Sequence, residues 1–250
     1  MIQSMPDRID SSKGSGLHPA ERSTHLKLGR WRFSSIELLI ALALIFVATP
    51  FVQAMEHGQA IESVLMTVML VSAVLAIGGR RRVLLVTAML AAPAIFMRWF
   101  HHFRPDLVPL QAHYVTAVIF LGFVILNLLR FVLRTPRVDA EVLCASISAY
   151  LLLGLLWTLG YLIEAGINPG AFILNTSGPT GGQMDSFNAF YFSFVTLSTV
   201  GYGDITPVSR VARMLAITES MTGLLYVAVL IARLVSVYSA QSPTTPSDSL

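Results

Sequence analysis

The chain has 250 residues, of which 54% are hydrophobic and only 12% are charged. A soluble domain carries about 25% charged residues, so this composition excludes a soluble globular protein and indicates an all-α membrane protein. The formal net charge of +3 depends mostly on where arginine lies, so we do not read it as affinity for nucleic acid. Cys144 is the only cysteine, which excludes an intrachain disulfide and a cysteine-based metal site.

The two ends of the chain are polar. Residues 1–33 are rich in Ser, Pro and Gly and lack the apolar core and cleavage site of a signal peptide. We therefore predict a disordered cytoplasmic tail over 1–33 and a second, short cytoplasmic tail over 240–250.

Four apolar segments follow the first tail, and they predict transmembrane helices. A helix needs roughly 20 residues to cross the hydrocarbon. The third segment is short and contains Pro93, which predicts a kink. Together the four segments form an auxiliary domain over residues 34–137. The segments are 34–51, 61–77, 83–97 and 113–129.

The remaining residues, 138–239, predict a two-helix pore domain. Apolar segments at 140–163 and 208–237 would span the membrane, which makes six transmembrane helices in all. Between them lies a shorter apolar run, 187–197, with Asp185 or Ser186 as its N-cap. A helix of this length is roughly 20 Å long, so we expect a re-entrant pore helix. The negative end of its dipole would point toward the membrane centre, where a cation must sit.

The stretch that follows the pore helix is Thr-Val-Gly-Tyr-Gly-Asp, residues 199–204. Gly201 and Gly203 flank Tyr202, and only glycine takes positive φ freely. Successive carbonyls can therefore turn toward one axis and, with the Thr199 hydroxyl, replace the water shell of a dehydrated cation. The alternative is a chance Gly-Tyr-Gly turn, which six matching residues between two apolar helices make a minority interpretation.

Residues 190–204, FYFSFVTLSTVGYGD, resemble the pore helix and selectivity filter of pore-loop potassium channels. The resemblance implies passive K⁺ conduction without enzymatic chemistry, no cofactor besides the permeant ion, and a homotetramer in membrane lipid. It also implies an anionic ring of Asp204 at the outer mouth. K⁺ would be coordinated within the filter formed by Thr199, Val200, Gly201, Tyr202 and Gly203.

Two positions depart from the family pattern. Tyr191 and Phe192 stand where many members carry tryptophan, so the packing that supports Tyr202 is expected to be softer. Val195 stands where some relatives carry glutamate, so a carboxylate contact to Asp204 from behind the filter is excluded.

Two residues of the last helix have more than one interpretation. Gly223 matches the glycine that many family members use as an inner-helix hinge, and close helix packing explains it equally well. Glu219 is an embedded carboxylate and hence a candidate functional group. The interpretation that we favour is structural, with a protonated carboxyl bonded to Ser193 or Thr196.

Positive residues predict the orientation. The amino-terminal tail, residues 80–82 and residues 130–137 place most arginines on one side, which makes both termini cytoplasmic and turns the filter outward. Arg98 and Arg104 count against this prediction. The expected location is the plasma (cell inner) membrane.

The fourth segment lacks the charges of a voltage sensor. Residues 114–129 carry none, while Arg130 and Arg134 lie at its inner end. We therefore expect weak or absent voltage gating. Only residues 135–139 connect this segment to the next, so the auxiliary domain should pack beside the pore helices of its own chain.

Two alternatives to a K⁺-selective channel stay open. A non-selective cation channel usually shows a change within the Gly-Tyr-Gly triplet, which is intact here. The second alternative is a potassium transporter or a non-conducting regulatory channel subunit. Transporter relatives carry four degenerate filters in one chain, whereas this chain has one filter.

Overall fold

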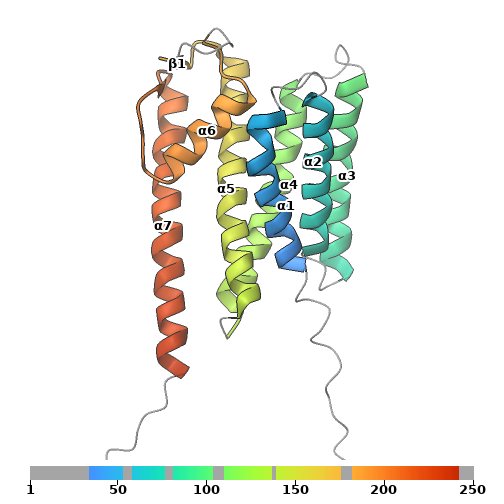
Figure 1. Ribbon diagram of the computed structural model, residues 1–250, viewed down its shortest axis with the longest axis vertical. Helices are drawn as coiled ribbons and strands as arrows, with labels where there is room; N and C mark the ends of the chain where they lie inside the picture. The colour runs from blue at the N-terminus through green and yellow to red at the C-terminus, as the bar shows by residue number, and fades with distance from the viewer. Residues whose placement is uncertain are drawn as a thin grey trace, which may run out of the picture.

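The computed structural model describes residues 34–52, 58–76, 81–103, 110–136, 139–175 and 182–241. Both predicted tails lie outside these residues, apart from the last turn of the final helix. The described part contains seven helices and two short strands (Figure 1). They are α1 (Ser34–Val52), α2 (Gly58–Ala76), α3 (Arg81–Phe103), α4 (Leu110–Arg134), α5 (Ala140–Ile167), β1 (Phe172–Leu174), α6 (Ser186–Leu197), β2 (Ile205–Pro207) and α7 (Arg210–Gln241).

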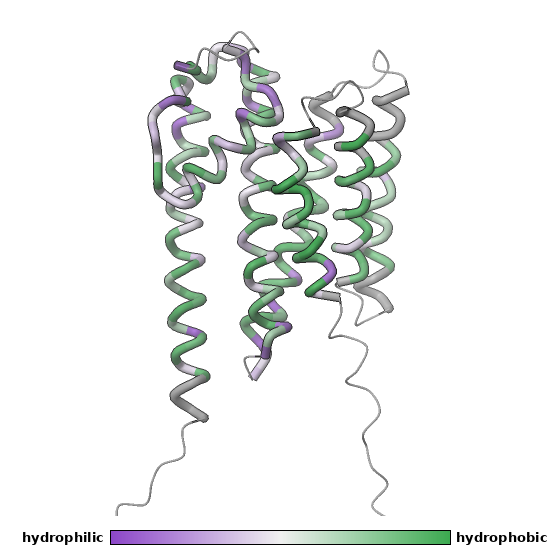
Figure 2. Tube along the Cα trace, in the orientation of Figure 1, coloured by the Kyte–Doolittle hydropathy of each residue, from purple (hydrophilic) through white to green (hydrophobic). Residues whose placement is uncertain are grey.

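The helices form two groups that meet along α5. Helices α1 to α4 make an amino-terminal bundle, while α5, α6 and α7 make a carboxyl-terminal unit (Figure 1). The described ends of the chain, at the start of α1 and the end of α7, lie on the side opposite β1. Apolar residues follow the bodies of the helices, and polar residues gather near β1 (Figure 2).

Three of the described helices are long and apolar enough to cross a membrane. They contain the candidate spans His113–Arg134, Ala140–Ile167 and Arg210–Val237. The other three predicted spans correspond to shorter apolar stretches, Ser35–Phe51, Val64–Leu75 and Leu85–Phe96. The membrane character of the chain is therefore supported by three helices, and the count of six spans stays a prediction.

The amino-terminal bundle packs on α5 of the same chain, as the short connection predicts. Buried residues of α1, α4 and α5 belong to one apolar cluster that includes Leu42, Val124 and Leu152. Helix α5 begins at Ala140, which leaves no room for a long linker helix. The Arg233 guanidinium of α7 donates to the Thr135 carbonyl oxygen at 2.9 Å, a further contact within one chain.

The prediction of an all-α fold was wrong in one detail. Strands β1 and β2 form a two-stranded antiparallel sheet, in which Phe172 pairs with Pro207 and Leu174 with Ile205. Strands of three residues are too short to show the alternation that identifies a strand in sequence. The pairing is set by the return of the chain from the 199–204 stretch to the end of α5.

Candidate functional site

Helix α6 is the element that positions the candidate site. Its Asp185 N-cap accepts a hydrogen bond from the Asn188 amide at 2.8 Å, which satisfies one of the free N–H groups of the first turn. The helix has 12 residues, which corresponds to about 18 Å and is too short to span the hydrocarbon. It packs against both α5 and α7, the covering by protein that a re-entrant helix requires.

Positive φ recurs at every second residue of the stretch that follows α6. Gly201 and Gly203 have φ of +57° and +80°, as the sequence predicts for the two glycines. Thr199 has φ of +60° and is the only described non-glycine residue with a positive value. A β-branched residue rarely adopts this conformation, and such strain concentrates at functional sites. This backbone is not an extended strand, in which successive carbonyls would point to opposite sides.

The carboxyl end of α6 holds the start of this stretch. The Phe194 carbonyl oxygen accepts from the Ser198 amide at 3.1 Å and from the Ser198 hydroxyl at 2.6 Å. The Val195 carbonyl oxygen accepts from the amides of Val200 at 2.9 Å and Gly201 at 3.4 Å. Because these amides are engaged by the helix end, the position of the last turn of α6 determines where the following carbonyls lie.

The other end of the stretch is fixed by the strand pair and by Tyr191. The Asn175 amide donates to the Asp204 carbonyl oxygen at 2.8 Å, next to the sheet. The Tyr191 hydroxyl forms a hydrogen bond with the Asp204 carboxylate. The phenol is the donor of this bond, since an ionised carboxylate can only accept. A contact to Asp204 from behind therefore exists, made by a tyrosine.

The side chains of the stretch are largely uncovered by their own chain. Val200 is 51% exposed and Tyr202 is 71% exposed. Helix α7 is similarly uncovered, since only 11% of its membrane-span window is buried, compared with 56% for α5. These apolar surfaces lie on one unit and are available to a neighbouring molecule or to lipid.

Glu219 is fully buried where α5, α6 and α7 meet. Its carboxyl group accepts from the Tyr161 hydroxyl, and its Oε1 lies 2.6 Å from the Ser193 hydroxyl oxygen. That hydroxyl also lies 2.7 Å from the Gly154 carbonyl oxygen, but it has a single proton to donate. A protonated Glu219 that donates to Ser193 would satisfy every oxygen in the group.

Gly223 lies where α7 approaches the end of α6. A Cβ at this position would come within 2.2 Å of the Leu197 carbonyl oxygen. The close approach of two backbones is a sufficient reason for glycine here. Helix α7 continues without interruption from Arg210 to Gln241.

Three features of the site were not predicted from the sequence. They are the left-handed backbone of Thr199, the bond from Tyr161 to Glu219, and the contact of Phe46 in α1 with α6. The segment that contains Tyr161 also carries the hydroxyls of Ser146, Ser148, Tyr150 and Thr158, so the sequence does not single out Tyr161. Nothing in the sequence singles out Phe46 among the chain's 14 phenylalanines.

Comparison with known proteins finds similarity in the part of the chain that contains α6, the 199–204 stretch and α7. A family described as "Ion channel" matches residues 161–240, which run from the end of α5 through α7. Two-pore potassium channel 4 of Arabidopsis thaliana is 49% identical over 49 residues, which are 20% of this chain and 17% of that protein.

Two microbial relatives match over a longer stretch. The hyperpolarization-activated voltage-gated potassium channel of Methanocaldococcus jannaschii is 32% identical over 117 residues, 44% of this chain and 49% of the relative. Protein LctB of Geobacillus stearothermophilus is 31% identical over 122 residues, 48% of this chain and 90% of the relative. The chain spans less than half the length of the potassium channels it matches. No solved structure matches it.

Proposed function

We propose that this chain, which belongs to the ion channel family, is a K⁺-selective channel that conducts passively through residues 199–203. Family membership confirms the resemblance to potassium channels noted in the sequence and identifies an ion channel and not an enzyme. The observation that carries the proposal is the Thr-Val-Gly-Tyr-Gly-Asp stretch with positive φ at Thr199, Gly201 and Gly203. Carbonyl rings of this kind replace the hydration shell of K⁺.

The proposed assembly is a homotetramer in membrane lipid. One chain supplies a single strand of carbonyls, and a ring around an ion requires several copies. The exposed side chains of Val200 and Tyr202, together with the uncovered face of α7, give the surface that neighbouring copies would bury. The permeant K⁺ ions are the only other component required.

The proposed orientation follows the arginines and the path of the chain. With both termini cytoplasmic, the end of the filter at Asp204 faces outward, on the same side as β1 and β2. The plasma (cell inner) membrane is the proposed location. Residues 34–137 serve as the auxiliary domain and 138–239 as the pore domain.

The test is a reversal-potential measurement on the purified full chain in planar bilayers, with K⁺ on one side and Na⁺ on the other. The proposal expects reversal close to the K⁺ equilibrium potential. Reversal near zero would favour the non-selective cation channel instead. Assembled protein that carries no current under any voltage would favour the non-conducting regulatory subunit.

A further inference from the structure

The ring of Phe194 lies between two helices from different parts of the fold. On one side is Gly154 of α5, where an added Cβ would come within 2.2 Å of the Phe194 ring. On the other side is Phe46 of α1, whose ring centroid lies 4.6 Å from that of Phe194 at an interplanar angle of 76°. The absence of a side chain at Gly154 therefore makes the space that Phe194 occupies.

Phe190, one turn earlier in α6, completes the contact. Its ring centroid lies 4.9 Å from that of Phe46 and 4.8 Å from that of Phe194. The three rings form the α1–α6 aromatic cluster, in which both pairs made by Phe46 have the edge-on geometry that stabilises aromatic pairs beyond their buried area. Through these rings the amino-terminal bundle contacts the pore helix directly, and Figure 1 shows α1 reaching the level of α6.

Backbone hydrogen bonds connect the α1–α6 aromatic cluster to the filter. Phe194 supplies the carbonyl oxygen that accepts twice from Ser198, and the next residue, Val195, accepts from Val200 and Gly201. A shift of the Phe194 side chain moves the carbonyls that hold these amides. Because protein interiors are close-packed, such a shift is passed on and is not absorbed locally.

From these contacts we propose that Phe46 is a positioning residue for the selectivity filter. Through the α1–α6 aromatic cluster, the amino-terminal bundle sets the position of the last turn of α6 and hence the geometry of residues 198–201. The bundle would then affect which ion the filter conducts. This effect is distinct from opening or closing of the pore by a movement of α7. The inference rests on the proposed K⁺ conduction.

The main test compares Phe46→Ala with Phe51→Ala, since both are in α1 but Phe51 is 69% exposed and contacts no ring of α6. Each full-length variant is reconstituted in bilayers after its assembly is checked by size-exclusion chromatography. We expect Phe46→Ala to lower the K⁺/Na⁺ permeability ratio about tenfold and Phe51→Ala to leave it within about twofold of the unaltered protein. An assembled Phe46→Ala protein with an unaltered ratio and unaltered single-channel conductance would overturn the inference.

A second pair of variants separates positioning from mere packing. Gly154→Ala should push the Phe194 ring toward α1 and lower the same ratio. If Phe46 sets the position of that ring, the double variant Phe46→Ala with Gly154→Ala gives the ring space and recovers part of the loss. Additive losses in the double variant would contradict the proposal, since neighbours that share one contact should couple.

Phe46→Leu covers the case in which Phe46→Ala does not assemble. Leucine keeps an apolar side chain but lacks the ring, so an assembled protein with a reduced ratio supports the positioning role. Failure of both variants to assemble would reject it, because Phe46 would then only hold the fold. If the unaltered protein conducts Na⁺ as well as K⁺, the proposed function fails, and single-channel conductance across the same variants still decides the role of Phe46.

Discussion

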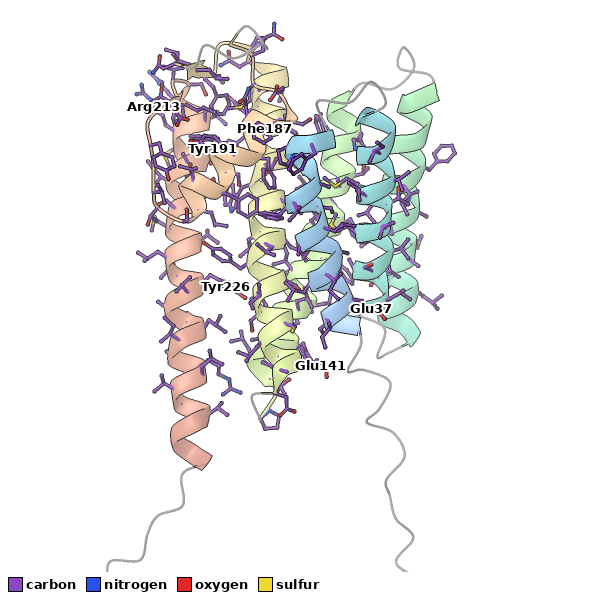
Figure 3. All side chains as sticks on the ribbon, in the orientation of Figure 1. Glu37, Glu141, Phe187, Tyr191, Arg213 and Tyr226 are labelled. Atoms are coloured by element: carbon purple, nitrogen blue, oxygen red, sulfur yellow. The ribbon has the colours of Figure 1, made fainter. Side chains whose placement is uncertain are left out.

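The amino-terminal bundle and the carboxyl-terminal unit are held together by different kinds of contact. In the unit, side-chain hydrogen bonds join separate helices, as in the bonds of Tyr161 and Ser193 to Glu219 and of Tyr226 to the Ser146 carbonyl oxygen. Figure 3 shows Tyr226 in the space between α7 and α5. In the described part of the bundle, Thr49 and Asn127 donate to carbonyls of their own helices, and buried apolar side chains form the core between the helices.

This difference has a physical consequence. A buried hydrogen bond between helices fixes both distance and direction, whereas apolar contacts tolerate volume-conserving changes. The carboxyl-terminal unit should therefore be sensitive to single-atom changes, and the bundle should be comparatively tolerant. The α1–α6 aromatic cluster lies where the amino-terminal bundle contacts the carboxyl-terminal unit.

The largest effect is expected from Gly201→Ala. Its φ of +57° is unfavourable for any residue with a Cβ, so the filter backbone must change or the chain must store strain. We expect the K⁺ current to fall at least ~100-fold, as misplacement of about 1 Å can cause. Current measured in bilayers on variant protein that assembles normally is the check, and a current like that of the unaltered protein would break the comparison.

Removal of the Glu219 side chain should come next. Glu219→Ala leaves the buried Tyr161 hydroxyl without a partner, at about 1–3 kcal/mol, whereas Ser193 keeps the Gly154 carbonyl oxygen. The matched change in the bundle is Glu37→Ala, which removes an exposed carboxylate and should alter stability by no more than about 0.5 kcal/mol. Thermal unfolding of both proteins in the same detergent compares them, and equal stability losses would contradict the expected difference.

A pair of glycine substitutions gives a smaller contrast. Gly223→Ala places a Cβ within 2.2 Å of the Leu197 carbonyl oxygen, whereas Gly122→Ala in α4 meets nothing within 4 Å. We expect a loss of about 1–3 kcal/mol for the first change and no loss for the second. Unfolding measurements should be paired with open probability, because a hinge role predicts altered gating of Gly223→Ala without a loss of stability.

The smallest effect is expected from Arg130 and Arg134. Both are exposed near the carboxyl end of α4, and the preceding 15 residues carry no charge. A charge that crosses 100 mV is worth about 2.3 kcal/mol, and these two stay outside the field. Neutralising both to Gln should leave open probability against voltage unchanged, whereas a steep curve that flattens would assign the bundle a sensing role.

Sequence alone was sufficient for the local features. The short α6 and the positive φ of Gly201 and Gly203 follow from residue types at fixed spacing, and of the two N-cap candidates, Asp185 and Ser186, the structure has Asp185. The helices extend beyond the predicted segments because the polar and basic ends of α3 and α4 continue the helix past the apolar residues on which the predictions relied.

Long-range contacts could not be predicted in the same way. The contact of Phe46 with Phe194 joins segments almost 150 residues apart, and no periodicity encodes such a pairing. The positive φ of Thr199 is likewise imposed by its surroundings, since threonine alone disfavours it. Both features depend on how helices are placed against one another.

The strand pair β1–β2 fixes the number of residues that the chain can have between α6 and β2. The filter is attached at one end to the last turn of α6 and at the other, through Asp204, to a three-residue sheet with defined register. An inserted or deleted residue between Thr199 and Asp204 would therefore shift the sheet by one position and invert which side chains of β2 face inward. Evolution can substitute residues in this segment, but it cannot change their number without rebuilding both attachments.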